Sequence, residues 1–464
     1  MEADSTSSNS TGGHTAVLGG GALGLTLALR IAQRGERVTV LERQSVAGGL
    51  AAGFKPAPEL PGGGPYLEKF YHHIFRSDTR IIELIEELGL RGRLQWSSPI
   101  NSVQYGGRRW QPYTPPGLLG FTPVPFVDRV RMGVVVAALK ATPTHRPFEH
   151  LTAHTWLRRA MGPRAYAVLW EPILRAKFGA RFQEISMAWL WARIHDRSFT
   201  LGYLTGGFQL LYDALVAEIR RLGGEVKLGH EVIEARQDGS TSEAPAWTVR
   251  WRRVQPPESL VHSGAFDRVV STLPTRLTLR LIEQLPAEFR KRFDWGDAYG
   301  AHCLVLALDR RLFTDGSYWL NVNDPGYPFL VLVEHTNYVP ATEYGGRHLL
   351  YLGNYLPHEH AVFLKTKQEI LTEYLPAIRR IVPEFRDEWV RESWSFAAPF
   401  AQPIVTREFP AHIPPFRAPL PGLWLASMFQ VYPHDRGQNY SIALAEDLVV
   451  EMAREGRLAA IVTP

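Results

Sequence analysis

The chain has 464 residues, which is too long for one compact core and suits two or three lobes of ordinary domain size. Hydrophobic residues make up 45% and charged residues 21% of it, which excludes a largely disordered chain, a collagen and a small disulfide scaffold. The net charge of +5 comes without a dense Lys/Arg tract, so no nucleic-acid partner is expected. A basic patch for an anionic substrate or a membrane surface stays open.

One cysteine, Cys303, excludes intramolecular disulfides and cysteine-rich metal sites, and it fits a reducing, cytoplasmic compartment. No stretch reaches the roughly 20 apolar residues that a membrane-spanning helix needs. The N-terminus does not look like a secretory signal, because it carries Glu2 and Asp4 and no basic residue before Arg30. Residues 1–13 form a Ser/Thr/Gly tail that we expect to be disordered.

The first ordered segment predicts a βαβ unit. His14–Leu18 has the pattern of a short buried strand, Leu25–Arg34 has apolar residues at helical spacing, and Gly35 ends that helix. A second strand, Arg37–Leu41, follows and ends in Glu42. The turn between the first strand and the helix reads GxGxxG, which in this context is typical of a dinucleotide site.

Each of the three motif glycines in the turn has an expected role. Gly19 permits the tight turn, Gly21 lets the backbone approach a pyrophosphate, and Gly24 lets helix and strand pack closely. The amides at the start of the helix, at Ala22 and Leu23, are expected to face the phosphates with the positive end of the helix dipole.

The residues after the second strand favour FAD over NAD. Glu42 can accept hydrogen bonds from a ribose diol and would repel a 2′-phosphate. Arg43 follows it, and a further diglycine, Gly48-Gly49, comes a few residues later, before Leu50.

At this point the chain resembles the flavoprotein superfamily of amine oxidases, protoporphyrinogen oxidases, carotenoid desaturases and UDP-galactopyranose mutases. In that superfamily the acid and the diglycine close over the diphosphate and ribose of FAD. Amine oxidases and protoporphyrinogen oxidases usually have Arg after the diglycine, whereas this chain has Leu50. The departure weakens close kinship with those two groups and leaves the FAD prediction intact.

The segment Glu68–Arg76 resembles the His-Ile-Phe element of the mutases, in which the His lies close to the isoalloxazine. We therefore place His73 near the flavin and treat it as a weak catalytic candidate; the alternative is ordinary loop packing. Neighbours in a strand point to opposite faces, so His72 and His73 make a poor metal pair.

Residues 77–200 read as a long, mainly helical insertion. Ile81–Leu88 is predicted to be helical, and Gln104–Trp110 to form a hairpin that turns at Gly106-Gly107. Phe126–Leu139 alternates apolar and basic residues at helical spacing, which suits either a peripheral contact with a membrane or packing on its own domain.

The second half of the insertion resembles the protoporphyrinogen-oxidase pattern that builds the substrate lobe. Lys177 resembles, in chemistry only, the flavin-adjacent Lys of amine oxidases, and it is the second weak catalytic candidate. Basic residues make this lobe suitable for a carboxylated or phosphorylated substrate, although each could instead lie on a solvated helix face. They are Arg164, Arg175, Lys177, Arg193 and Arg197.

Later segments match the superfamily again. Gly206-Gly207 opens a helix, and the residue that matches Val232 clasps the adenine in relatives through its backbone. Apolar runs at Cys303–Leu308, Phe329–Val333 and His348–Leu352 predict a central sheet. Five aromatic residues could wall a pocket, but core packing is the commoner role; they are Tyr318, Trp319, Tyr327, Trp394 and Phe396.

The chain ends as the relatives do, with a late strand at Gly422–Ala426 and a helix that points at the flavin. Asn439 is expected to cap this helix, with Gln438 beside it, so that free amides stabilise negative charge on the flavin. Asp435 is the candidate ribityl ligand.

These assignments predict an α/β fold: an FAD-binding, Rossmann-type domain resembling glutathione reductase, with an inserted α+β substrate domain. The FAD-binding parts are expected at 14–76, 201–274 and 401–464, and the substrate parts at 77–200 and 275–400. No second GxGxxG unit follows, so electrons would leave to oxygen, a quinone or a carrier. His150 and His154 lack the Glu of a metalloprotease motif, and no metal site is predicted.

The resemblance implies an FAD-dependent oxidoreductase in which flavin N5 accepts hydride from an organic small molecule. One alternative is a mutase-like flavoenzyme that acts on a sugar nucleotide without net redox change, although the paired arginines of the mutases are not found in the sequence. A second alternative is a binding protein that keeps the fold without chemistry, as Rab escort proteins do.

Overall fold

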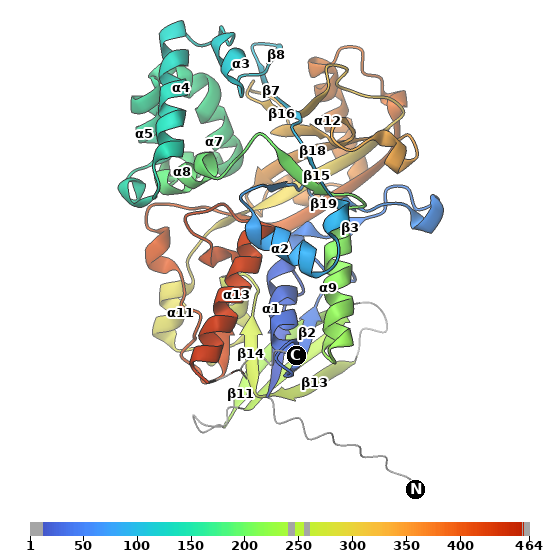
Figure 1. The fold of residues 1–464 in the computed structure, drawn as a ribbon, viewed down its shortest axis with the longest axis vertical. Helices are drawn as coiled ribbons and strands as arrows, with labels where there is room; N and C mark the ends of the chain where they lie inside the picture. The colour runs from blue at the N-terminus through green and yellow to red at the C-terminus, as the bar shows by residue number, and fades with distance from the viewer. Residues whose placement is uncertain (1–12, 240–245, 255–259, 457, 459–464) are drawn as a thin grey trace.

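The computed structural model describes residues 13–239, 246–254, 260–456 and 458, so the expected N-terminal tail lies outside the described residues except for Gly13. Figure 1 shows a lower lobe that holds both α1 and α13, and two bodies above it: helices on the left, and a sheet with α12 on the right. The expected α/β fold is confirmed.

The lower lobe is built on a five-stranded parallel sheet in the order β10-β2-β1-β14-β20. Its central strands are buried, with apolar residues at their centres, as a parallel sheet covered on both faces requires. The predicted βαβ unit is confirmed, with the helix starting earlier than expected, at Ala22. The elements are β1 (His14–Leu18), α1 (Ala22–Ala32), β2 (Arg37–Glu42), β10 (Glu225–Leu228), β14 (Arg268–Ser271) and β20 (Leu423–Leu425).

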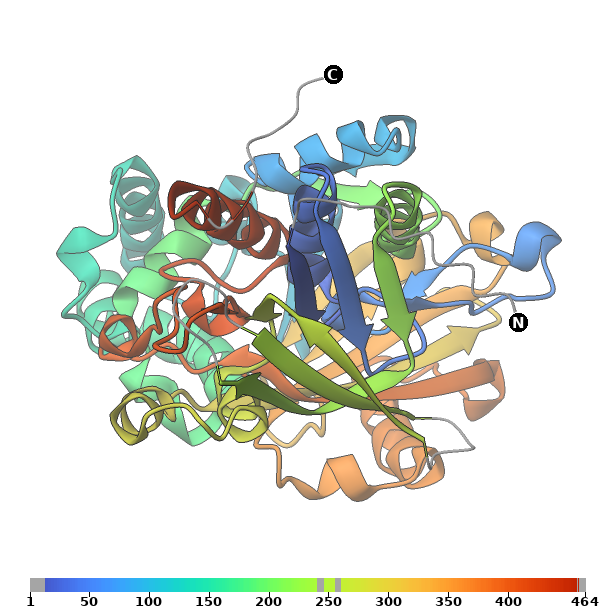
Figure 2. The same ribbon diagram turned by 90° about the horizontal axis from the view of Figure 1, so that it is seen from below.

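Different layers cover the two faces of this sheet, as the view from below shows (Figure 2). One face packs on α1, α2 (Thr79–Glu87), α9 (Gln209–Arg221) and α13 (Gln438–Arg454). The other packs on the antiparallel sheet of β11 (His230–Asp238), β12 (Ala246–Arg253) and β13 (Val261–Phe266). Because Ile81, Leu84 and Ile85 of α2 belong to the first core, this core extends past the expected segment end at residue 76.

The upper right body is a seven-stranded sheet in the order β19-β15-β18-β17-β16-β7-β8, packed on α12 (Lys367–Ile381). Two of the apolar runs predicted as strands lie in β15 and β18, the run Phe329–Val333 overlaps β17, and the predicted hairpin is β7 and β8. β19 crosses the expected boundary at residue 400. The strands are β7 (Ile100–Tyr105), β8 (Arg108–Trp110), β15 (Ala298–Leu308), β16 (Ser317–Val322), β17 (Val331–Glu334), β18 (His348–Leu356) and β19 (Val390–Pro403).

The upper left body is helical, as predicted for this part of the insertion. Its helices are α3 (Pro115–Leu119), α4 (Phe126–Ala141), α5 (Ala153–Met161), α6 (Pro163–Ala165), α7 (Glu171–Phe178) and α8 (Met187–His195). One side of α4 leaves apolar side chains exposed, at Phe126, Val127, Val130 and Val134. Contact of this face with a membrane stays a prediction. Among the helices of the described residues, none has both the length and the apolar character that crossing a bilayer requires.

Short elements complete the chain. They are β3 (Gly53–Phe54), β4 (Leu67–Glu68), β5 (Ile74–Phe75), β6 (Leu94–Ser97), β9 (Leu201–Leu204), α10 (Thr275–Leu281) and α11 (Ala287–Phe293). β9 pairs with β5 and β6, and so joins the two segments that flank the helical insertion.

Candidate functional site

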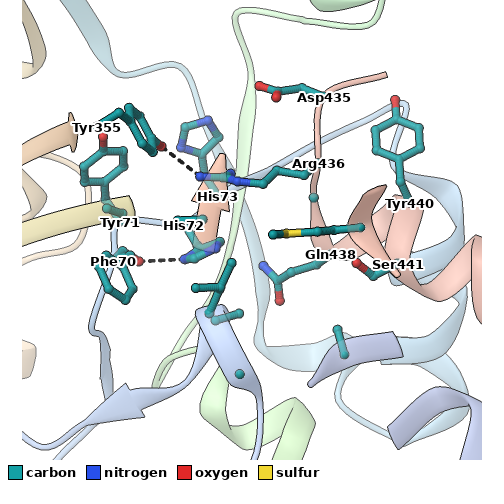
Figure 3. A pocket seen from close by; sticks show the side chains of 18 of the residues that line it. Phe70, Tyr71, His72, His73, Tyr355, Asp435, Arg436, Gln438, Tyr440 and Ser441 are labelled. Carbon is teal, nitrogen blue, oxygen red and sulfur yellow. Dashed lines mark hydrogen bonds between the residues drawn. The ribbon is translucent and has the colours of Figure 1, made fainter. Parts of the chain in front are cut away.

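A cavity of about 460 Å³ lies where the lower lobe meets the two upper bodies. Its wall combines the N-terminal ends of α1 and α13 with residues of α7, α8, β15, β16 and β18. Figure 3 shows side chains from widely separated segments converging on it.

The glycine turn forms one end of the cavity. Gly19 has a φ of +110°, which favours glycine, and a Cβ at Gly24 would lie 2.0 Å from the Gly19 carbonyl oxygen. Gly21 is the N-cap of α1, and no side chain in the described chain caps the helix. The first amides of α1 are therefore free to bind an anion, as the sequence predicts.

The diglycine packs directly against this turn. The Gly48 amide donates to the Gly20 carbonyl oxygen at 2.8 Å, and a Cβ at Gly49 would lie 3.2 Å from the Gly21 Cα. Glu42 is fixed from both sides, because its two carboxylate oxygens accept from the Gly20 and Gln44 amides, each at 2.7 Å. Both glycines and Glu42 line the cavity.

The N-terminus of α13 faces the same cavity. Gly437 is its N-cap, and no side chain of the described residues caps the helix, so the expected capping role of Asn439 is wrong. The Asn439 Oδ1 instead accepts from the Ile81 amide of α2 at 3.2 Å, since that buried amide needs an acceptor. Gln438 accepts from the Tyr212 hydroxyl, and both side chains are buried.

Two neutral histidines line the middle of the cavity. The His72 Nδ1 lies 2.6 Å from the Phe70 carbonyl oxygen, which can only accept, so this nitrogen carries the proton. Burial lowers the pKa of His72 to about 4 and that of His73 to about 3. Both lie ahead of β5, where strand alternation does not apply, and both therefore face the cavity, contrary to the expectation of opposite faces.

The other end of the cavity is built around Asp435. The Lys177 Nζ donates to its Oδ2 at 2.8 Å, and Arg193 donates to the same oxygen. The Trp189 indole and the Gln402 amide reach Oδ1 at 3.3 and 3.4 Å. Both oxygens accept hydrogen bonds within the protein, and the ribityl role expected for Asp435 stays a prediction.

Charge and burial shape this cluster. Burial opposes ionisation of Asp435, but Lys177, Arg193 and Arg436 outweigh it and hold the pKa of this carboxyl well below its ordinary value. Burial and the neighbouring Arg193 lower the pKa of Lys177 well below its ordinary value, against the attraction of Asp435. Asp435 is therefore the fixed negative charge of this end of the cavity.

The structure brings most of the predicted site residues to the cavity wall. They are Gly19, Gly21, Ala22, Leu23, Glu42, Gly48, Gly49, Leu50, His73, Lys177, Asp435, Gln438 and Asn439. Three lie elsewhere among the described residues: Gly24 lies behind the turn, Arg43 pairs with Glu231 at 3.5 Å, and Val232 packs against the core between the parallel and three-stranded sheets. The adenine contact of Val232 stays a prediction.

The basic residues expected in the substrate lobe also fall into two groups, on the cavity wall and away from it. Arg193 and Arg197 line the cavity, whereas Arg175 pairs with Glu171 and Arg164 donates to the Pro123 carbonyl. Of the five aromatic residues singled out, all of them described, Trp319 alone reaches the cavity wall. Tyr318, Trp394, Phe396 and Tyr327 pack in or against cores, the commoner role. Within the part of the chain that the structure describes, no cluster of three or more His, Cys, Asp or Glu residues could hold a metal ion.

The wall residues that sequence reasoning missed include Tyr355, Asp196, Tyr440 and Arg436. The Asp196 carboxylate accepts from the Tyr440 hydroxyl at 2.9 Å and lies 2.7 Å from the His434 Nδ1. Arg436 could have been found, because it stands between the acid Asp435 and the start of the last helix.

Comparison with known proteins identifies the family of this fold. The model of the flavin-containing amine oxidoreductase family matches residues 24–434. The chain belongs to this family. The match confirms the expected superfamily and its flavin cofactor, FAD, and with them the oxidoreductase class at the level of the family.

Solved flavin amine oxidoreductases and their relatives have the same fold at low identity. A protein from an Exiguobacterium species, provisionally assigned as a protoporphyrinogen oxidase, is 15% identical with a TM-score of 0.71, covering 96% of this chain and 99% of that one. Cyclohexylamine oxidase from Brevibacterium oxydans is 14% identical with a TM-score of 0.66, at 96% and 99% coverage. A reduced UDP-galactopyranose mutase is 14% identical with a TM-score of 0.67, at 96% of both chains.

Proposed function

We propose that the protein is an FAD-dependent oxidoreductase that removes hydride from an organic small molecule. One observation carries the proposal: the uncapped N-termini of α1 and α13 face one cavity, and the Gly48-Gly49 element closes on the first of them. When bound, FAD supplies a hydride-accepting N5. The remaining contributions come from side chains and amides of this chain.

The two helix ends have different tasks in this proposal. The amides of α1 bind the diphosphate, and Glu42, held by two backbone amides, accepts from the ribose. The amides of α13 stabilise the negative charge that accompanies reduction. Gly24 keeps α1 close enough to β1 for the first of these contacts.

His72 is positioned to accept a hydrogen bond in the cavity. Its Nδ1–H is committed to the Phe70 carbonyl, so Nε2 keeps a lone pair, and the imidazole lines the cavity. With a pKa of about 4 it is neutral at pH 7 and accepts a hydrogen bond rather than carrying a charge.

The visible absorption spectrum of the purified protein, followed by that of the supernatant after denaturation, tests the proposal. We expect flavin bands and release of FAD. A colourless protein that does not take up added FAD would overturn the proposal and favour a non-catalytic binding protein of the same fold.

A second candidate is a mutase-like flavoenzyme acting on a sugar nucleotide without net redox change. The cations around Asp435 favour it, because they bring together arginines far apart in the sequence. Turnover of a sugar nucleotide by the chemically reduced protein, with no consumption of reductant, would select this candidate over the first.

We further propose a cytoplasmic location, which is supported by the single cysteine, Cys303, being buried and unpaired. We also propose that the exposed apolar face of α4 contacts membranes. Sedimentation with anionic lipid vesicles tests the contact. Binding that survives a Val127→Asp, Val134→Asp double change would exclude α4 as the contact.

A further inference from the structure

We infer that the Asp435 end of the cavity is an oxyanion site and that the substrate carries a carboxylate or phosphate group there rather than an ammonium group. The inference deepens the proposed function and rests on it, because it names the chemical class of the molecule that would be oxidised.

The cations at this end outnumber the carboxylate that they surround. Lys177 and Arg193 both donate to Asp435, and they are 8% and 19% exposed. Arg197 and Arg436 lie close enough for Asp435 to influence the pKa of each. One carboxylate thus faces four basic side chains.

Arg197 has no fixed partner. Its guanidinium makes neither a salt bridge nor a hydrogen bond to any described residue, and it lies over the Phe75 ring, 5.4 Å from its centre. Its accessible surface lines the cavity. Arg197 is an exposed residue; the protein atoms around its guanidinium and the neighbouring Arg193 lower its pKa to about 9, which still leaves it charged at neutral pH.

Arg436 is only partly satisfied. It donates to the Tyr355 hydroxyl at 3.1 Å, as Figure 3 shows, while its buried Nε has no hydrogen-bond partner within the described residues. Arg436 also lowers the pKa of His72, so it stands between the cation cluster and the histidines.

The other acids of the cavity wall form no ion pair with Arg197 or Arg436 in the described chain, although Arg197 lies close enough to Asp78 to lower the pKa of that carboxyl. Asp196 is occupied by His434 and Tyr440, and Glu42 by backbone amides at the glycine end. Asp78 accepts from the Phe75 amide at 2.8 Å, and burial raises its pKa to about 6. Each acid is held by its own donors, whereas Arg197 is not.

The chemistry of the free groups selects the ligand. Arg197 and Arg436 present guanidinium donors that no acceptor among the described residues meets, and the planar fork of a guanidinium matches carboxylate and phosphate oxygens. An ammonium group would meet like charges at the same place. The site therefore differs from what a simple amine substrate requires, although the family is named for amines.

Titration of the FAD-loaded protein with inorganic phosphate, acetate and putrescine tests the inference, with flavin absorbance and tryptophan fluorescence as readouts. We expect a saturable change with phosphate or acetate and none with putrescine. The tighter of the two anions assigns the substrate group as a phosphate or a carboxylate. A saturable response to putrescine alone, or to none of the three, overturns the inference.

Matched variants locate the binding. Arg197→Gln should weaken anion binding at least about tenfold, and Arg197→Lys should restore part of it. Arg175→Gln is the control, because Arg175 lies on the same body of the protein and is exposed like Arg197, but it is paired with Glu171 away from the cavity wall. Equal weakening by Arg175→Gln and Arg197→Gln overturns the inference.

The outcomes separate this inference from the proposed function. If phosphate releases FAD, the cations belong to the cofactor diphosphate and the inference fails while the flavin proposal stands. If the protein takes up no FAD, the proposed function fails, and tryptophan fluorescence still reports whether Arg197 binds anions, because Trp189 contacts the Asp435 cluster.

Discussion

The two ends of the cavity are built from different parts of the polypeptide. At the glycine end the groups that face the cavity are mainly backbone amides of the N-terminus of α1, held by tight turns. At the Asp435 end they are charged side chains from α7, α8 and the loop before α13. A backbone site recognises a group that a whole family shares, whereas a side-chain site can be changed one residue at a time.

The largest effect that would test this contrast is expected from Asp435→Asn. The change leaves Lys177, Arg193 and Arg436 without their common anion, so we expect the free energy of unfolding to fall by about 3 kcal/mol. Urea denaturation measures it, with Glu171→Gln, at an exposed pair, as the control. Equal stability of the two variants would show that Asp435 does not hold this end together.

Gly24→Ala should disrupt FAD binding at the glycine end of the cavity. The added Cβ would lie 2.0 Å from the Gly19 carbonyl oxygen, so the turn must shift and FAD affinity should fall about 100-fold. Flavin content after dialysis measures the loss. Gly133→Ala, in the interior of α4 where the nearest heavy atom is 3.8 Å away, is the control and should keep full flavin content.

The histidines between the two ends of the cavity should make the free energy of unfolding depend on pH. His72 has a folded pKa of about 4 against an ordinary 6.5, so the unfolded chain binds more protons between these values and stability falls as the pH drops through them. His72→Gln should remove about 3 kcal/mol of that fall. The exposed His358→Gln serves as control, and identical pH profiles for both variants would contradict the assignment.

The smallest effect is expected at Glu42. In Glu42→Gln one oxygen still accepts from the Gly20 amide, but the amide nitrogen cannot accept from Gln44, so FAD affinity should fall about tenfold. Isothermal titration with FAD measures it. Glu225→Gln, on the neighbouring strand β10, should leave the affinity unchanged.

The contrast also explains what the sequence could predict. The glycine turn, Glu42 and the diglycine lie within about thirty residues, and backbone geometry there follows from residue type, so their places in the cavity could be predicted. The strands of the second sheet could be predicted for a similar reason, since long apolar runs such as that of β15 have few alternatives.

The Asp435 end could not be predicted in the same way. Lys177, Arg193 and Asp435 are brought together only by tertiary packing, and the sequence indicated basic character without indicating partners. Asn439 failed as a cap because a buried amide of α2, a segment assigned to another domain, needed its oxygen. Long-range demands of this kind are not visible in local patterns.

The short connection between Asp435 and α13 has a further consequence. Gly437, the N-cap of α13, follows Asp435 by two residues, and Lys177 and Arg193 tie that aspartate to the helical body. An anion that competes for these cations acts on the same loop that aims the α13 amides. Any free energy of coupling between anion binding and the α13 terminus must be reciprocal. If a bound anion favours a change of charge at the α13 terminus by some factor, that change of charge raises the affinity for the anion by the same factor.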